Sequence, residues 1–267
     1  MNSGRPQIII YILYILLIPI IVSAETGLPQ FQDLLPLMSG STNTIQPYNT
    51  SEPAGETVSW DQKFILFSYK NKNIGYVNIQ SSKIVLPFRP PLYKCFIQTK
   101  SDLPIWFFSG KSVTEETEYY DEKINPLLFE FKLDSDDMNL VVQGKLSTGI
   151  SVSTSPGTYE ISWETAKTRK NASLDVPKNI CTAGNLRDII LSRDITKKQT
   201  YHLSLLDKYK MKYMTIRVNT GETVQIADET FYRVKLTMKI FGRFEFIVDK
   251  NGNVISGKGL GIKLIPM

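Results

Sequence analysis

The stretch from Lys212 to Lys263 constrains the fold more than any other part of this chain. Runs of β-branched and aromatic residues alternate there with turn-forming residues, which indicates an antiparallel meander. Asn251-Gly252 predicts a type I′ turn, because that turn needs a positive φ at both central residues. The other predicted turns are Asn219-Thr220-Gly221, Ala227-Asp228-Glu229 and Phe241-Gly242. A meander of this length exposes an apolar face that a second layer must cover.

Strand patterns also fill the chain before this meander. Trp60 to Gln80, Tyr93 to Thr99 and Leu127 to Leu133 contain short apolar or alternating runs, with turns about every 8–12 residues. This spacing is typical of a β-sandwich, a barrel or a deeply curved sheet. We expect residues 60–267 to form one mainly β domain, a curved antiparallel sheet of half-barrel or clam shape.

One segment breaks the strand pattern. Between Asn179 and Asp194, the apolar residues Leu186, Ile189 and Ile190 recur with helical spacing. Thr182 is the predicted N-cap. A single amphipathic helix in a β chain is expected on the concave side of the sheet, where it covers apolar residues that the strands leave exposed.

The first 24 residues have the pattern of a secretory signal peptide. Arg5 precedes a continuous apolar run over residues 8–22, and small residues lead to a predicted cleavage between Ala24 and Glu25. The run has fifteen residues, whereas a membrane-spanning helix needs about twenty. We therefore expect export to the periplasm, with membrane contact only through this segment before cleavage. The alternative is an uncleaved N-terminal anchor with the domain facing the periplasm.

Residues 25–59 form the predicted linker. Four prolines are interspersed there with Ser, Thr, Asn and Gly, and the apolar groups are short and aperiodic. Such a segment buries too little apolar surface to offset the entropy of ordering it. We expect disorder in this range.

The charge pattern argues against nucleic-acid binding. The formal net charge is +5, but Lys and Arg alternate with apolar residues, as in Arg233 to Leu236, and form no dense patch. The chain has two cysteines, Cys95 and Cys181. Because export permits a disulfide, this pair is the disulfide candidate, and two buried free thiols are the alternative.

Catalytic and metal-binding patterns are weak. A nucleophilic triad would need His202, the single histidine, which lies in a strand pattern without a nucleophile motif nearby. One histidine and two distant cysteines do not form a typical zinc set. Glu116 and Glu118 share one face of a strand, as many solvated pairs do. We therefore expect no enzyme activity, no metal and no cofactor.

Two further motifs have structural interpretations. The cluster Asp134, Asp136 and Asp137 lacks the Gly and distal Glu of a calcium loop, so we interpret it as a polar hairpin turn. Gly257, Gly259 and Gly261 resemble part of a phosphate loop but precede no helix. They are expected to permit strand curvature or close backbone approach.

A half-closed sheet has a concave face that can bind an apolar ligand. The large apolar side chains of the strands and the helix are the candidates for lining it. They are Trp106, Phe107, Phe108, Phe129, Phe131, Phe244, Ile189 and Ile190. The alternative for each is that it simply fills the core.

The chain also resembles the bacterial envelope proteins of the domain-of-unknown-function 3108 family, and the β domain that precedes some transglutaminase-like peptidase domains. The resemblance covers about residues 60–263 and rests on four stretches. They are Phe67-Ser68-Tyr69 with Ile74-Gly75, Tyr120-Asp121 with Asn125-Pro126-Leu127, Leu186-Arg187 to Tyr201, and Phe246 to Val254.

This resemblance implies a curved sheet wrapped around a helix and no established activity. Because this sequence ends at Met267, we expect no peptidase domain after it. The favoured function is a non-enzymatic periplasmic module that binds an apolar or lipid ligand or an envelope partner. The alternatives are a structural or assembly protein of the envelope without a ligand, and an accessory domain of an envelope peptidase.

Overall fold

The computed structural model describes residues 55–68, 70–85, 90–102, 111–136, 138–147, 157–208, 210–239, 242–259 and 261–267. The predicted signal segment, its cleavage site and most of the predicted linker lie outside these ranges. The predicted boundary at residue 59 is too late, because the first strand begins at Gly55 and pairs from there with Val85.

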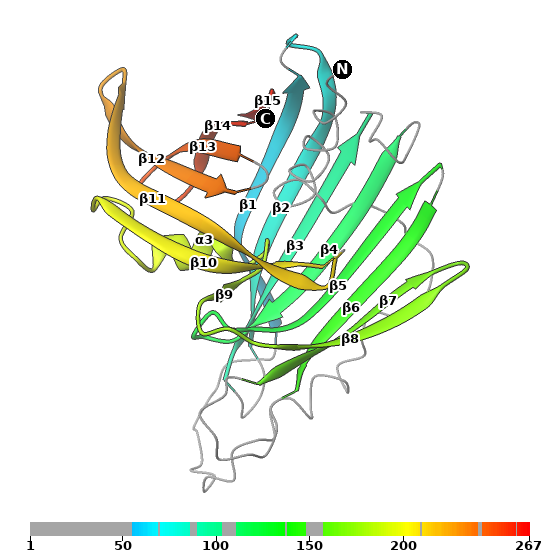
Figure 1. Ribbon diagram of the computed structural model, residues 1–267. Coiled ribbons are helices and arrows are strands. Elements are labelled where there is room, and N and C mark those ends of the chain that lie inside the picture. Colours follow the sequence, from blue (N-terminus) through cyan, green and yellow to red (C-terminus); the bar gives the residue numbers. More distant parts are fainter. Residues whose placement is uncertain are drawn as a thin grey trace, which may run out of the picture.

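The first eight strands follow one another in space in the order of the chain (Figure 1). They are β1 (Gly55–Ser68), β2 (Asn73–Val85), β3 (Leu92–Ser101), β4 (Ser112–Tyr120), β5 (Pro126–Ser135), β6 (Met138–Ser147), β7 (Thr158–Thr165) and β8 (Arg169–Asp175). Each pairs antiparallel with the next.

The remaining strands continue the same sheet on the other side of β1. They are β9 (Ile180–Cys181), β10 (Gln199–Asp207), β11 (Lys212–Ile226), β12 (Glu229–Met238), β13 (Gly242–Val248), β14 (Val254–Gly259) and β15 (Ile262–Pro266). β15 pairs antiparallel with β1 and joins the two halves, while β9 pairs parallel with β10.

The described strands therefore form one sheet whose ends are β8 and β9. The sheet is curved but does not close into a barrel (Figure 1). This confirms the predicted fold class, a mainly β, largely antiparallel curved sheet with a short helix.

Helix α3 (Leu186–Leu191) is shorter than predicted. Ile180 and Cys181 belong to β9, and Asn185 rather than Thr182 is the N-cap residue. The backbone N–H of Thr182 donates to Oδ1 of Asn185, which orders the turn before the helix.

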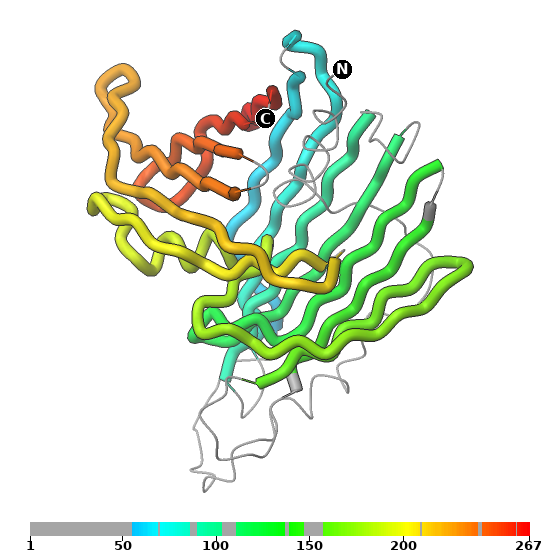
Figure 2. The backbone as a smooth tube through the Cα atoms, in the orientation of Figure 1, coloured from blue at the N-terminus to red at the C-terminus, as the bar shows by residue number. Residues whose placement is uncertain are grey.

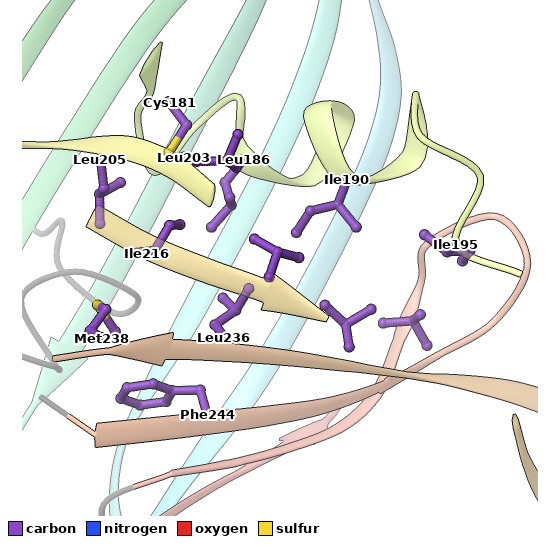
Figure 3. Close-up of a cluster of buried hydrophobic side chains, with 13 residues drawn as sticks. Cys181, Leu186, Ile190, Ile195, Leu203, Leu205, Ile216, Leu236, Met238 and Phe244 are labelled. Carbon is purple, nitrogen blue, oxygen red and sulfur yellow. The ribbon is translucent and has the colours of Figure 1, made fainter. Parts of the chain in front are cut away.

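The apolar face of α3 points into the concave side, as predicted. Figure 3 shows Leu186 and Ile190 directed toward Ile216 and Leu236 of the C-terminal strands. Both helix residues are buried, and Ile189 packs half-buried against the same cluster.

Two predicted turns differ from the structure. Asn219-Thr220-Gly221 lies inside β11, where the register with β12 shifts and Gly221 has a φ of +82°. The trace of β11 bends accordingly (Figure 2). Asn251-Gly252 does join β13 to β14, but only Gly252 has a positive φ, so the turn is not type I′. The backbone N–H of Asp249 donates to the carbonyl of Asn253, which closes a longer turn.

The predicted turn at Ala227-Asp228-Glu229 joins β11 to β12, whereas Phe241 of the predicted Phe241-Gly242 turn lies outside the described residues. The acidic cluster lies at the β5–β6 connection, with Asp137 itself outside the described residues. A Cβ at Gly257 would lie 2.9 Å from the Phe246 ring, and a Cβ at Gly259 would lie 2.2 Å from the Phe244 ring. Aromatic side chains thus pack directly on glycine backbone in the C-terminal strands.

Candidate functional site

Strand β4 directs a row of polar side chains into the concave side. Its burial alternates, with Ser112, Thr114, Glu116 and Glu118 all buried. Their register neighbours on β5 are largely apolar, since Phe131 lies opposite Glu116 in the ladder and Phe129 opposite Glu118. The two glutamates were interpreted from the sequence as a solvated pair, and that interpretation is wrong.

Lys208, just after β10, pairs with both glutamates. It is itself buried, and its Nζ lies 4.6 Å from the centroid of the Phe129 ring. The Thr182 hydroxyl donates to Oε2 of Glu118. We refer to Glu116, Glu118, Lys208 and Thr182 as the buried charge cluster. It fastens the segment before α3 and the end of β10 onto β4.

The buried charge cluster carries one negative charge in excess when all three ionisable groups are charged. Burial raises the pKa of the Glu118 carboxyl to about 7, although hydrogen bonds from Thr182 and from the Gly184 backbone lower it. Burial lowers the pKa of the Lys208 ammonium, whereas the two adjacent carboxylates favour its charged form. The net charge of the buried charge cluster therefore changes near neutral pH.

Both cysteines lie near this cluster, and both are free. Cys95 lies in a core cluster with Phe64 and Leu66, while Cys181 belongs to the cluster around α3. The disulfide candidate is thus wrong for this structure, because each thiol packs within its own apolar surroundings. Burial raises the pKa of both thiols, which keeps them in the unreactive protonated form.

A chain of polar contacts holds α3 from its other side. The Tyr120 hydroxyl donates to Oδ2 of Asp188 at 2.5 Å, and Arg187 donates to Oδ1 of Asp188 at 2.9 Å. Arg187 also donates to the carbonyl of Asn251 at 2.8 Å. Its guanidinium lies 4.3 Å from the ring centroid of Trp60. The helix is therefore tied to β4, to β1 and to the β13–β14 turn.

An apolar pocket of about 150 Å³ lies between α3 and the concave face of the sheet. Strands from both halves of the sheet contribute to its wall, together with the helix. The lining residues are Trp60, Phe64, Val77, Ile79, Ser81, Ile97, Ala183, Gly184, Leu186, Arg187, Ile190, Leu191, Ile195, Val234, Leu236, Phe246, Val248, Gly252, Val254 and Leu264. Among these described residues, Arg187 is the one charged side chain.

The pocket borders the buried charge cluster at Gly184. A Cβ there would lie 2.5 Å from Oε2 of Glu118, so the backbone of residue 184 separates the carboxylate from the apolar space. Gly252 also lines the pocket and lies close to the end of α3. A Cβ at that position would meet Leu191 at 2.7 Å.

The structure brings few of the predicted lining residues to this pocket. Ile190 lines it, and Ile189 packs beside it against the core. Phe129 and Phe131 lie in a separate core cluster with Tyr159, and Phe244 packs on Gly259.

The aromatic group Trp106, Phe107 and Phe108 lies outside the described residues. His202 is exposed on β10, and its backbone carbonyl accepts a hydrogen bond from Nδ2 of Asn179. Within the described ranges, no group of three His, Cys, Asp or Glu residues is arranged to hold a metal ion. No helix of those ranges is long and apolar enough to cross a membrane.

Sequence reasoning missed the buried charge cluster because Lys208 is 90 residues from Glu118. One local signal was available. In β4 both alternating faces are polar, yet the strand lies between two strands rich in apolar residues. A strand at that position must turn one polar face inward.

Comparisons with known proteins show a likeness of fold only. No protein family and no curated protein matches this chain. A β-barrel-like protein of the domain-of-unknown-function 1849 family from Brucella abortus is similar in structure, with a TM-score of 0.46 and 11% identity; the match covers 81% of this chain and 96% of that one. A domain-of-unknown-function 1089 protein from Pseudomonas aeruginosa has a TM-score of 0.34 and 9% identity, with 82% and 95% covered.

Proposed function

We propose that this chain is an exported binding protein for a small apolar group with an anionic end. The observation that carries this proposal is the pocket of about 150 Å³ beneath α3. An engineered cavity of that size with an apolar wall stays free of water and binds benzene. The pocket therefore fits one aromatic ring or a short acyl segment rather than a complete lipid.

The position of Arg187 favours an anionic end on the ligand. It is half-buried, and an arginine there can pair with a carboxylate in two-point geometry. Because Asp188 and two backbone carbonyls already accept from this side chain, a ligand would compete with them for its donors. The affinity is accordingly expected to come mainly from apolar contact.

A binding experiment on the full chain can test the pocket. Hexanoate and toluene are the probes, and the measurement is the shift of the melting temperature with probe concentration. The variant Ile79→Phe places extra volume at the pocket wall, and Val141→Phe introduces the same phenyl ring at an exposed position of β6. We expect both probes to stabilise the unaltered chain and Val141→Phe, and to lose most of their effect on Ile79→Phe.

Two results would contradict the proposal. The first is that neither probe shifts the melting temperature of the folded, unaltered chain. The second is that Ile79→Phe is stabilised by the probes as strongly as Val141→Phe. If Ile79→Phe fails to fold, Ile190→Phe fills the same pocket from the helix and replaces it in the comparison.

The export part of the proposal rests on the apolar run over residues 8–22 and the small residues before Glu25. Cell fractionation with N-terminal sequencing tests it. The expected product begins at Glu25 and is found outside the cytoplasm. An intact Met1 on protein from the cytoplasm would overturn this part and leave the pocket proposal standing.

A further inference from the structure

Strand β8 is an open edge of the sheet. It has seven residues, and within the described parts of the chain the sheet ends at it. The other end of the sheet is β9, which has two residues. An exposed strand edge presents unpaired N–H and C=O groups to another chain. Of the two ends, only β8 is long enough for an extended partner to pair with it.

The β7–β8 hairpin determines which backbone groups face outward. Thr165 donates to the carbonyl of Thr168, so these two residues form a hydrogen-bonded pair next to the turn. Such pairs alternate with non-hydrogen-bonded pairs along an antiparallel ladder. The backbone N–H of Val176 donates to the carbonyl of Gly157, which agrees with this alternation. The outward-facing residues of β8 are therefore Arg169, Asn171, Ser173 and Asp175.

The β8 sequence RKNASLD is complementary to itself in antiparallel orientation. With Ala172 on a two-fold axis, Arg169 faces Asp175 of the second copy, and Asn171 faces Ser173 of that copy. Each outward-facing residue then meets another outward-facing residue, which the hydrogen bonding of a continuous ladder requires. Shifting the axis by one residue to Asn171 or Ser173 keeps this matching but removes both Arg–Asp pairs.

We propose that β8 is a self-association edge at which two copies of this chain pair antiparallel about Ala172, extending the sheet across a two-fold axis. The partner is a second copy because the pairing satisfies both terminal charges and places no like charges opposite each other. Arg169 and Asp175 lie on the exposed face of the strand. The pairs are thus solvent-accessible and add modestly to the backbone ladder.

The size of the contact sets the expected affinity. A seven-residue strand pair is smaller than the interface of about 1,200–2,000 Å² that stable complexes bury. We therefore expect a dissociation constant in the micromolar range, and sedimentation velocity must cover concentrations on both sides of it.

A proline substitution tests the backbone ladder directly. Asn171→Pro removes an outward N–H, and it leaves the β7 ladder intact because residue 171 donates nothing to β7. Asn171→Ala is the matched control, since it changes the side chain and keeps the N–H. We expect the full chain and Asn171→Ala to dimerise, and Asn171→Pro to sediment as a monomer with an unchanged circular dichroism spectrum. A dimer that survives Asn171→Pro, or a chain that is monomeric at all concentrations, overturns the proposal.

Charge reversal tests the register and remains informative if the proline variant misfolds. Arg169→Asp places two acidic side chains opposite each other, and Asp175→Arg places two basic ones opposite each other. Each variant alone should dimerise about tenfold more weakly. An equimolar mixture should regain dimers, because both cross-strand pairs are then of opposite charge. A mixture no stronger than either variant alone contradicts the Ala172 register.

Discussion

Two neighbouring regions lie under the segment of residues 182–191, and the protein fills them differently. The buried charge cluster is occupied by the protein's own side chains, with Lys208 in contact with Glu116 and Glu118. The apolar pocket, a few residues away, leaves about 150 Å³ unfilled. The backbone of Gly184 separates the two regions.

This contrast indicates that the two regions have different roles on the concave side of the sheet. Buried charges are costly unless each finds a partner, so the polar region admits one arrangement and fixes the position of the helix. Apolar side chains tolerate a void at a smaller cost, so the pocket can remain available for a ligand. The buried charge cluster on one side of Gly184 thereby holds the helix in place, and the pocket on the other side can accept a ligand.

The largest expected effect comes from removing the lysine. Lys208→Met leaves two buried carboxylates without a cation, which should lower the free energy of unfolding by about 3–5 kcal/mol. The control is Lys94→Met, which removes the partner of Glu56 in an exposed pair and should cost less than about 1 kcal/mol. Urea denaturation of both variants gives the comparison. Equal costs would show that the buried charge cluster does not hold the fold.

The next effect is a pH dependence of stability that belongs to Glu118. Its folded pKa of about 7 lies above the ordinary value of 4.5, so the folded state binds the proton more tightly than the unfolded state. The stability from this group is fully present below pH 4.5 and is lost as the pH rises toward 7, by up to about 3 kcal/mol. Denaturation midpoints between pH 4.5 and 8 measure it.

Glu118→Gln is the matched variant for this pH experiment. The amide cannot ionise, so the fall in stability between pH 4.5 and 7 should become shallower by the contribution of this group. An unchanged pH profile in the variant would assign the dependence to other residues.

A smaller effect is expected in the pocket. Ile190→Ala removes a buried side chain from its wall and should cost about 2 kcal/mol, the low end for such changes, because one side of Ile190 already faces the void. The same substitution enlarges the pocket, so toluene should bind the variant more tightly. Ile189→Ala, beside the pocket, should cost stability without changing toluene binding.

The smallest predicted effect concerns the tie between β1 and α3. Trp60→Leu removes the ring beneath Arg187, and a double-mutant cycle with Arg187→Met should give a coupling of about 1 kcal/mol. A coupling near zero would indicate that the hydrogen bonds to the β13–β14 turn hold Arg187 without the ring.

Local patterns predict the sheet well and the site poorly. Strand alternation and the helical spacing of Leu186, Ile189 and Ile190 are short-range signals, and they lead to the correct fold class. The alternation rule assigns polar residues to solvent, so it misplaces Glu116 and Glu118. Their partner, Lys208, follows β10, and this part of the chain reaches β4 only after the chain folds back.

The pocket illustrates a second limit of sequence reasoning. Large aromatic residues are the natural candidates for a lining, yet Phe129 and Phe244 are packed against Gly144 and Gly259, where they fill space completely. Most of the actual wall consists of aliphatic side chains brought together from strands far apart in the sequence. Side-chain type alone cannot distinguish residues that fill a core from residues that border a void.

The pairing of β1 with β15 has a consequence for the order in which the protein can be built. Phe64 lies beside Pro266 in the ladder, so the seam joining the two halves spans about two hundred residues. During synthesis, β1 to β8 can assemble as they emerge, while the outer edge of β1 stays bare until the last strand is made. Contacts of such long range form slowly, and an uncovered edge invites misassembly in the meantime. The half-built sheet therefore stays open to misassembly until β15 pairs with β1.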